Sequence, residues 1–96
     1  MTGTFDIIRE DGEKGGRYVL RRDGAEAEMT YSRLSPARII VDHTGVPEAL
    51  RGTGAGLALA ERMVADAREA GVRVIALCPF VKAQARRHPE WADVIE

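Results

Sequence analysis

One stretch of this chain is best suited to bind a ligand: an arginine followed by three glycines at alternate positions. Arg51-Gly-Thr-Gly-Ala-Gly56 combines a permanent positive charge with a backbone that can approach a ligand closely. The amphipathic stretch after it predicts a helix with no Asp or Glu in its first turn. Because a helix N-terminus carries about half a unit of positive charge, the pattern predicts a phosphate site. A glycine-rich loop that holds no ligand is the alternative.

Two familiar phosphate-binding motifs do not fit this turn. A Walker loop requires Gly-Lys followed by Ser or Thr, and the turn contains no lysine. A dinucleotide fingerprint requires glycine where Leu57 stands, and it belongs to a repeated βαβ fold. Both classes of nucleotide-binding domain are therefore excluded.

The first half of the chain predicts an antiparallel β-meander. Strands are expected at residues 17–22, 26–32 and 38–44, and the Asp23-Gly24 pair between the first two is a strong hairpin signal. Residues 26–32 alternate apolar and polar side chains, which indicates a strand with one buried face. Ile7 and Ile8 are expected to begin an edge strand before the meander.

The second half predicts a βαβ crossover. A helix over residues 54–70 leads into a strand at 72–78, which we expect to lie parallel to the strand before the helix. Both strands of the crossover are apolar on both faces, so we expect the sheet to be covered on both sides there. A short helix is expected over residues 82–87. The predicted fold class is α/β of the α+β type, in one domain spanning residues 1–96.

The overall composition is that of an ordinary globular chain. It has 96 residues, 45% of them hydrophobic and 30% charged, with a net charge of -1 and one cysteine. We expect a cytoplasmic protein without a disulfide or signal peptide, because the single cysteine suits a reducing compartment. No apolar run approaches the ~20 residues that a membrane span needs. We expect no membrane, nucleic acid or metal ion as a partner.

Several short patterns around the glycine turn resemble those of one family. They are His43-Thr44, Val46-Pro47, Cys78-Pro79-Phe80 and Arg87-His88-Pro89-Glu90. The turn itself resembles the Arg/Gln-x-x-Gly-x-Gly/Ala signature of the GCN5-related N-acetyltransferases. The order of the patterns is similar to that of their small, YjdJ-like branch, over the chain from about Tyr18 to the end. The resemblance implies a minimal acyl-CoA N-acyltransferase fold.

The resemblance also implies acetyl-CoA, or coenzyme A, as the cofactor. The backbone at His43, Thr44 and Val46 would pair with the pantetheine arm as though it were another strand. The arm would lie between the 38–44 and 72–78 strands. The pyrophosphate would be held by the residues of the turn, Arg51, Gly52, Thr53, Gly54, Ala55 and Gly56.

Cys78 and His43 are the candidate catalytic residues for acetyl transfer. Cys78 could donate to the leaving thiolate, accept the acetyl group or form a disulfide with CoA, or it could simply pack in the core. His43 is expected on the same strand face as Ile39 and Val41, where it could act as a base or be a buried structural residue.

A basic run near the C-terminus has two interpretations. Lys82, Arg86 and Arg87 are either a solvated helix face or, for the two arginines above all, a grip on the CoA 3′-phosphate or adenine end. The function predicted by resemblance is acetyl transfer from CoA to an amine of a small molecule or protein. The alternative is a non-catalytic acyl-CoA binder, sensor or interaction module on the same fold. We expect a monomer or a weak homodimer.

Overall fold

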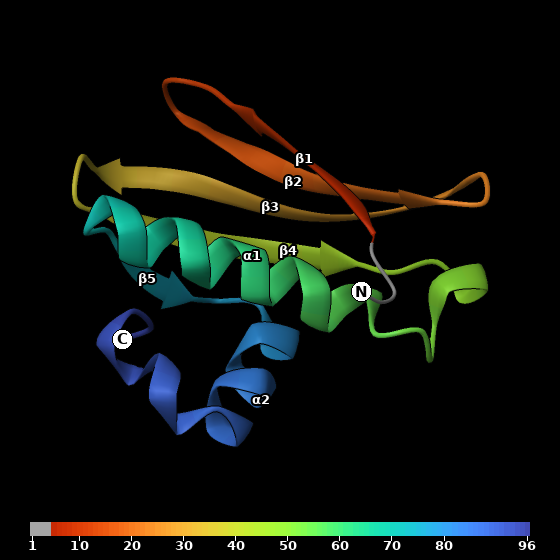
Figure 1. Ribbon diagram of the computed structural model, residues 1–96. Coiled ribbons are helices and arrows are strands. Elements are labelled where there is room, and N and C mark those ends of the chain that lie inside the picture. The colour runs from red at the N-terminus through yellow and green to blue at the C-terminus, as the bar shows by residue number, and fades with distance from the viewer. Residues whose placement is uncertain (1–4) are drawn as a thin grey trace.

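The computed structural model describes residues 5–96 as one five-stranded sheet with two helices (Figure 1). The sheet has the strand order β1-β2-β3-β4-β5, antiparallel from β1 to β4 and parallel between β4 and β5. The strands are β1 (Asp6–Asp11), β2 (Gly15–Arg22), β3 (Ala25–Ser35), β4 (Arg38–Gly45) and β5 (Arg73–Ala76). The helices are α1 (Ala55–Ala70) and α2 (Pro79–Arg87), with 3-10 turns η1 (Glu48–Leu50) and η2 (Pro89–Asp93). The predicted fold class, a meander leading into a βαβ crossover, is confirmed.

Strand β5 is shorter than predicted, and α2 begins earlier. The N–H groups of Leu77 and Cys78 both donate to the Val41 carbonyl oxygen, at 3.1 and 3.2 Å, so the chain turns away from β4 there. Pro79 then takes the first position of α2. Proline suits that position because the N–H group that it lacks would have no partner within the helix.

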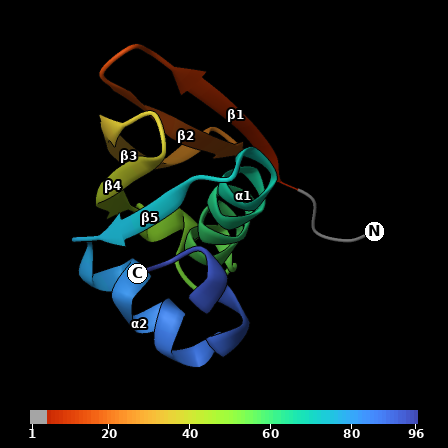
Figure 2. The same cartoon turned by 90° about the vertical axis from the view of Figure 1, so that its left-hand side faces the viewer.

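The core lies between the sheet and α1, with α2 beside α1 next to β5 (Figures 1 and 2). Arg68 of α1 donates to Asp93 of η2 at 2.7 Å, which ties the C-terminal turn to the same side. On the opposite face, Ile40 and Ile75 stay half-buried and outside the core. The expectation that the crossover strands are covered on both sides is therefore wrong, because both helices gather on one face.

A β-bulge in β4 changes which side chains face the core. Thr30 of β3 pairs with His43, whereas the next residue, Tyr31, pairs with Val41, so Asp42 is an extra residue in β4. An extra residue shifts the side-chain alternation by one. Thr44, rather than His43, therefore shares the α1-facing side with Val41.

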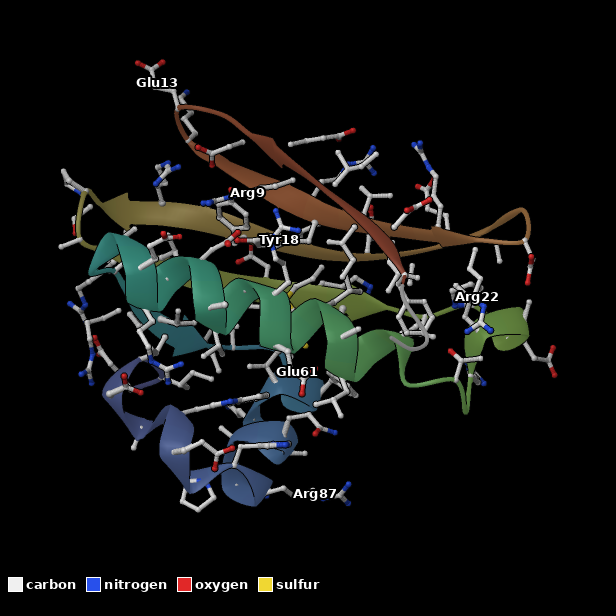
Figure 3. All side chains as sticks on the ribbon, in the orientation of Figure 1. Arg9, Glu13, Tyr18, Arg22, Glu61 and Arg87 are labelled. Carbon is white, nitrogen blue, oxygen red and sulfur yellow. The ribbon has the colours of Figure 1, made fainter. Side chains whose placement is uncertain are left out.

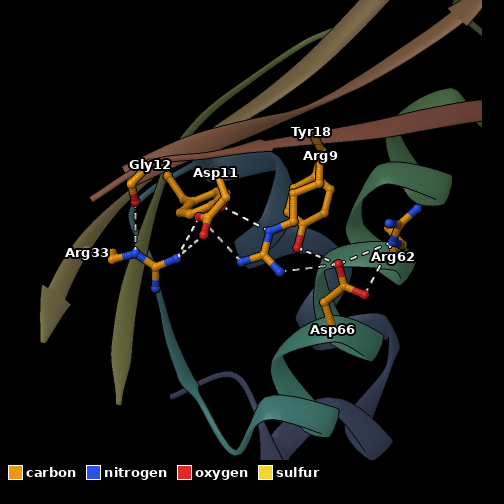
Figure 4. Close-up of polar contacts among 8 residues, drawn as sticks. Arg9, Asp11, Gly12, Tyr18, Arg33, Arg62 and Asp66 are labelled. Atoms are coloured by element: carbon orange, nitrogen blue, oxygen red, sulfur yellow. Dashed lines mark hydrogen bonds and ion pairs between the residues drawn. The ribbon is translucent and has the colours of Figure 1, made fainter. Parts of the chain in front are cut away.

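A polar cluster joins the outer strands to α1 (Figure 4). The hydroxyl of Tyr18, which is buried in the core, donates to the Asp66 carboxylate of α1 at 2.9 Å. Arg9 of β1 lies 3.6 Å from the same carboxylate and donates to the Tyr31 hydroxyl at 3.0 Å. Arg62 adds an i,i+4 contact to Asp66. Burial, followed by the bond to Asp66, raises the pKa of Tyr18, so the phenol stays a donor at physiological pH.

Among residues 5–96, no helix combines the length and the apolar character needed to cross a membrane.

We predict that Asp66→Asn lowers the free energy of unfolding by about 1–3 kcal/mol, because it removes the charged acceptor of the buried Tyr18 hydroxyl. Urea unfolding followed by circular dichroism measures this loss. Glu61→Gln is the matched control on the exposed face of α1 (Figure 3), where about 0.5 kcal/mol or less is expected. Equal losses for the two variants would show that the cluster contributes nothing specific.

Candidate functional site

A cleft of about 420 Å³ opens where the end of β4, the glycine turn and the first turns of α1 and α2 meet. Most of the residues predicted to hold CoA line it. They are Thr44, Val46, Arg51, Gly52, Gly54, Ala55 and Gly56. Four further residues complete the lining: Leu50, Leu57, Phe80 and Gln84.

Two glycines of the turn have backbone conformations that other residues rarely adopt. Gly52 has φ 79° and Gly54 has φ 88°, both in the left-handed region. A Cβ atom built on either residue would meet no atom within 4 Å. The requirement for glycine at these two positions is therefore conformational, and the space beside the backbone stays open to the cleft.

Some backbone N–H groups of the turn donate hydrogen bonds within the protein, and others are unused as donors. The N–H and the hydroxyl of Thr53 both donate to the Leu50 carbonyl oxygen, so Thr53 shapes the turn, and it does not line the cleft. The first bond of α1 runs from the Ala58 N–H to the Gly54 carbonyl oxygen, and Gly54 caps the helix without a side-chain bond. Within the described part of the chain, unused donors remain on five cleft-lining residues: Gly52, Gly54, Ala55, Gly56 and Leu57.

The cleft is positively charged at one end and apolar along its walls. Among residues 5–96, Arg51 is the one charged residue that lines the cleft. It is exposed, and its guanidinium group adds donors beside the unused N–H groups. The first turn of α1 holds no acidic residue. The walls are formed by Val46, Leu50, Leu57 and Phe80. This arrangement suits an anion at the mouth and an apolar chain along the cleft.

Gly56 has a packing role that the sequence did not reveal. A Cβ atom on Gly56 would lie 2.7 Å from the Cζ atom of Phe80, because the Phe80 ring packs directly against this turn of α1. Gly56 lies within the helix and has no positive φ. Glycine is therefore needed at this position because the Phe80 ring, which lines the cleft, leaves no room for a larger side chain. It is not needed for the shape of the turn.

Strand β4 has an unpaired edge beside the cleft. Its pairing with β5 ends at Val41 and Ala76, whereas β4 continues to Gly45. On that side, the backbone of residues 42–45 has no strand partner among the described residues. Thr44, in this segment, also lines the cleft. An extended ligand in the cleft can therefore pair with β4 in the place that β5 has left.

The two predicted catalytic residues lie on opposite sides of β4. Cys78 is only 2% exposed, and its thiol donates to the Thr44 hydroxyl oxygen at 3.3 Å. His43 is exposed on the opposite face, and its Nε2 atom lies 3.2 Å from where a Cβ on residue 45 would stand. The prediction that His43 shares a face with Ile39 and Val41 is wrong, because the bulge at Asp42 intervenes.

The basic residues of α2 lie outside the cleft lining. Arg86 and Arg87 are exposed in the last turn of the helix, and Arg87 points away from the molecule in Figure 3. Gln84, one turn after Phe80 on the same helix, lines the cleft instead. The helix predicted over residues 82–87 does not include Phe80, so the sequence did not predict that Phe80 and Gln84 lie one turn apart on the same helix. Within residues 5–96, no His, Cys, Asp or Glu cluster of three or more could hold a metal ion.

We predict that Gly56→Ala lowers the free energy of unfolding by about 1–3 kcal/mol, since the methyl group overlaps the Phe80 ring. In the double variant with Phe80→Leu, the cost of the alanine should fall below about 1 kcal/mol, because the overlapping ring is gone. Thermal or urea unfolding of the four proteins in this cycle gives the coupling. Additive losses, with no coupling between the two positions, would contradict the packing role.

Comparisons with known proteins agree with this geometry. The family model described as GCN5-related N-acetyl-transferase matches residues 17–94. The NMR structure of a GCN5-like candidate N-acetyltransferase from Staphylococcus aureus is similar, with a TM-score of 0.72 and 33% identity. The similarity covers 93% of this chain and 87% of that one. No curated protein matches the chain. The chain belongs to the GCN5-related N-acetyltransferase family.

Proposed function

We propose that the protein binds acetyl-CoA in the cleft and transfers the acetyl group to an amine of a small molecule or a protein. The observation that carries this proposal is the set of unused N–H donors that line the cleft beside Arg51. Family membership supports the same ligand and reaction.

The pyrophosphate of CoA fits the positive end of the cleft. It would accept hydrogen bonds from the N–H groups of Gly52, Gly54, Ala55 and Gly56, with Arg51 neutralising part of its charge. Thr53 would contribute by holding the turn in shape, because its own N–H group is already used. Arg86 and Arg87 lie outside the lining, so a contact with the 3′-phosphate requires the nucleotide end to reach across the surface of α2.

The pantetheine arm fits the unpaired edge of β4. Its amide groups would pair with the backbone of His43, Thr44 and Val46, in the manner of an added strand. Val46, Leu50 and Phe80 would cover its methylene groups. In this arrangement the thioester would lie near the bulge, where β4 and β5 separate.

The transfer reaction needs a proton acceptor for the amine and stabilisation of the leaving sulfur. The amine nitrogen attacks the thioester carbon, the new C–N bond forms and the C–S bond breaks. His43 lies on the uncovered face of the sheet, beside the unpaired edge of β4. We assign it as the base that takes the amine proton, with the acceptor approaching from that face.

Arg51→Ala should raise the Kd for acetyl-CoA by about 10–100-fold, the effect of losing one charge-assisted contact with a phosphate. Isothermal titration calorimetry measures this change. Arg21→Ala, at an exposed arginine on the uncovered face, is the matched control and should leave the Kd unchanged. No binding of acetyl-CoA to the unmodified protein would refute the proposed function.

His43→Ala should lower kcat for acetyl transfer to amines by about 100-fold while leaving the Kd for acetyl-CoA within about threefold. A panel of amines and lysine peptides, assayed by release of the CoA thiol, provides the measurement. Arg21→Ala, on the same face but without a contact to β4, is again the control. Binding without transfer to any amine would favour the alternative function, a non-catalytic acyl-CoA-binding module.

A further inference from the structure

We propose that the Thr44 hydroxyl donates a hydrogen bond to the CoA sulfur as the C–S bond breaks, and that Cys78 is the residue that positions this hydroxyl. The inference rests on the proposed function, because it requires CoA in the cleft. It assigns a donor to the leaving group and gives the buried cysteine a role other than that of a nucleophile.

The position of Thr44 follows from the bulge at Asp42. Without the extra residue, Thr44 would point to the uncovered face, as His43 does now. With it, the Thr44 side chain lies on the α1-facing side and lines the cleft. Thr44 also belongs to the segment of β4 whose edge is unpaired. A ligand that pairs with this edge therefore passes directly beside the hydroxyl.

The Thr44 hydroxyl accepts a hydrogen bond from Cys78, and its own O–H group remains free to donate one. The thiol is the donor in the 3.3 Å contact, and the Thr44 oxygen is the acceptor. Among the described residues, no acceptor takes the hydroxyl hydrogen of Thr44. A hydroxyl has one donor and two acceptor positions, so accepting from Cys78 leaves its O–H group available to the cleft. Cys78 itself does not line the cleft.

The surroundings of Cys78 hold the thiol in this position. The residue is 2% exposed and caps the N-terminus of α2, where its N–H group donates to the Val41 carbonyl oxygen. The same Val41 carbonyl marks the end of the β4–β5 pairing. The hydroxyl therefore lies on β4 and the thiol at the start of α2, just after β5, one on each side of the opening.

In the proposed reaction, the two reactants lie on opposite faces of β4. The amine approaches from the face that carries His43, and the sulfur remains with the pantetheine arm on the side of Thr44. As the C–S bond breaks, the sulfur takes the bonding electron pair and becomes a thiolate. The Thr44 hydroxyl stabilises this charge by hydrogen bonding, without transferring its own proton. The amine proton passes to His43, and the products are the amide and CoA thiolate.

The test compares the binding of CoA and acetyl-CoA across pH, because only CoA has a thiol that titrates. A donor to the thiolate lowers the thiol pKa of bound CoA below that of free CoA. CoA affinity relative to acetyl-CoA should therefore rise as the pH increases from 7 to 10. Lowering that pKa by about one unit corresponds to a tenfold rise in affinity. Calorimetry at several pH values gives both affinities.

Thr44→Val, which has the same shape but no hydroxyl, should abolish this rise and lower kcat by about 10–100-fold. Thr44→Ser should retain both. Cys78→Ala should weaken the rise, and Cys78→Ser, which keeps a donor, should restore it. The ratio of the CoA and acetyl-CoA affinities is taken within each of the four variants, so a change that affects both ligands equally cancels. Circular dichroism is the control for folding.

Three outcomes would overturn the inference while leaving CoA binding intact. The first is an unmodified protein whose relative CoA affinity does not rise with pH. The second is a Thr44→Val variant that keeps the rise. The third is an acetyl group on Cys78, found by mass spectrometry after mixing with acetyl-CoA, since this would make the cysteine a nucleophile. Failure of both ligands to bind would refute the proposed function as well.

Discussion

The site depends on where β4 and β5 stop pairing. Their backbone bonds end at Val41 and Ala76, and β4 then runs on alone to Gly45. Backbone N–H and C=O groups are strong hydrogen-bonding groups, so an unpaired strand edge beside a cleft is a template for an extended ligand. The Val41 carbonyl oxygen receives the N–H groups of Leu77 and Cys78, which turns the chain into α2. The Val41 carbonyl group therefore lies where the β4–β5 pairing ends, where α2 begins and where the cleft opens.

The bulge at Asp42 and the glycine turn complete the site at its two ends. The bulge places His43 on the uncovered face and Thr44 on the side of the cleft. The glycine turn leaves N–H donors unused at the start of α1. At the other end of α1, the bond between Tyr18 and Asp66 fastens the helix to the sheet. The position of the helix N-terminus relative to β4 depends on such contacts.

Much of the fold follows from the sequence, because local signals and topology agree. The Asp23-Gly24 hairpin, the period-two strand after it and the amphipathic helix all predict what the structure contains. The glycine turn likewise predicts an anion site at a helix start, and the structure places most of its residues on the cleft. These features are encoded within a few neighbouring residues.

Other features of the site depend on tertiary structure and leave weaker marks in the sequence. A bulge needs only one extra residue, and nothing about Asp42 distinguishes it from an ordinary strand residue, so the sequence pattern predicts the wrong face for His43. The packing of Phe80 on Gly56 joins residues far apart in the chain. The apolar character of Ile40 and Ile75 suggested coverage on both faces, whereas both helices lie on one.

The central claim is that the unused N–H groups of the glycine turn hold the pyrophosphate of acetyl-CoA. Amide chemical-shift mapping by NMR during an acetyl-CoA titration tests it most directly. The account predicts the largest shifts at Gly52, Gly54, Ala55, Gly56 and Leu57, with further shifts at residues 42–45 of β4. The amides of β1 should stay unchanged. Large shifts confined to residues outside the cleft, or no shifts at all, would contradict the account.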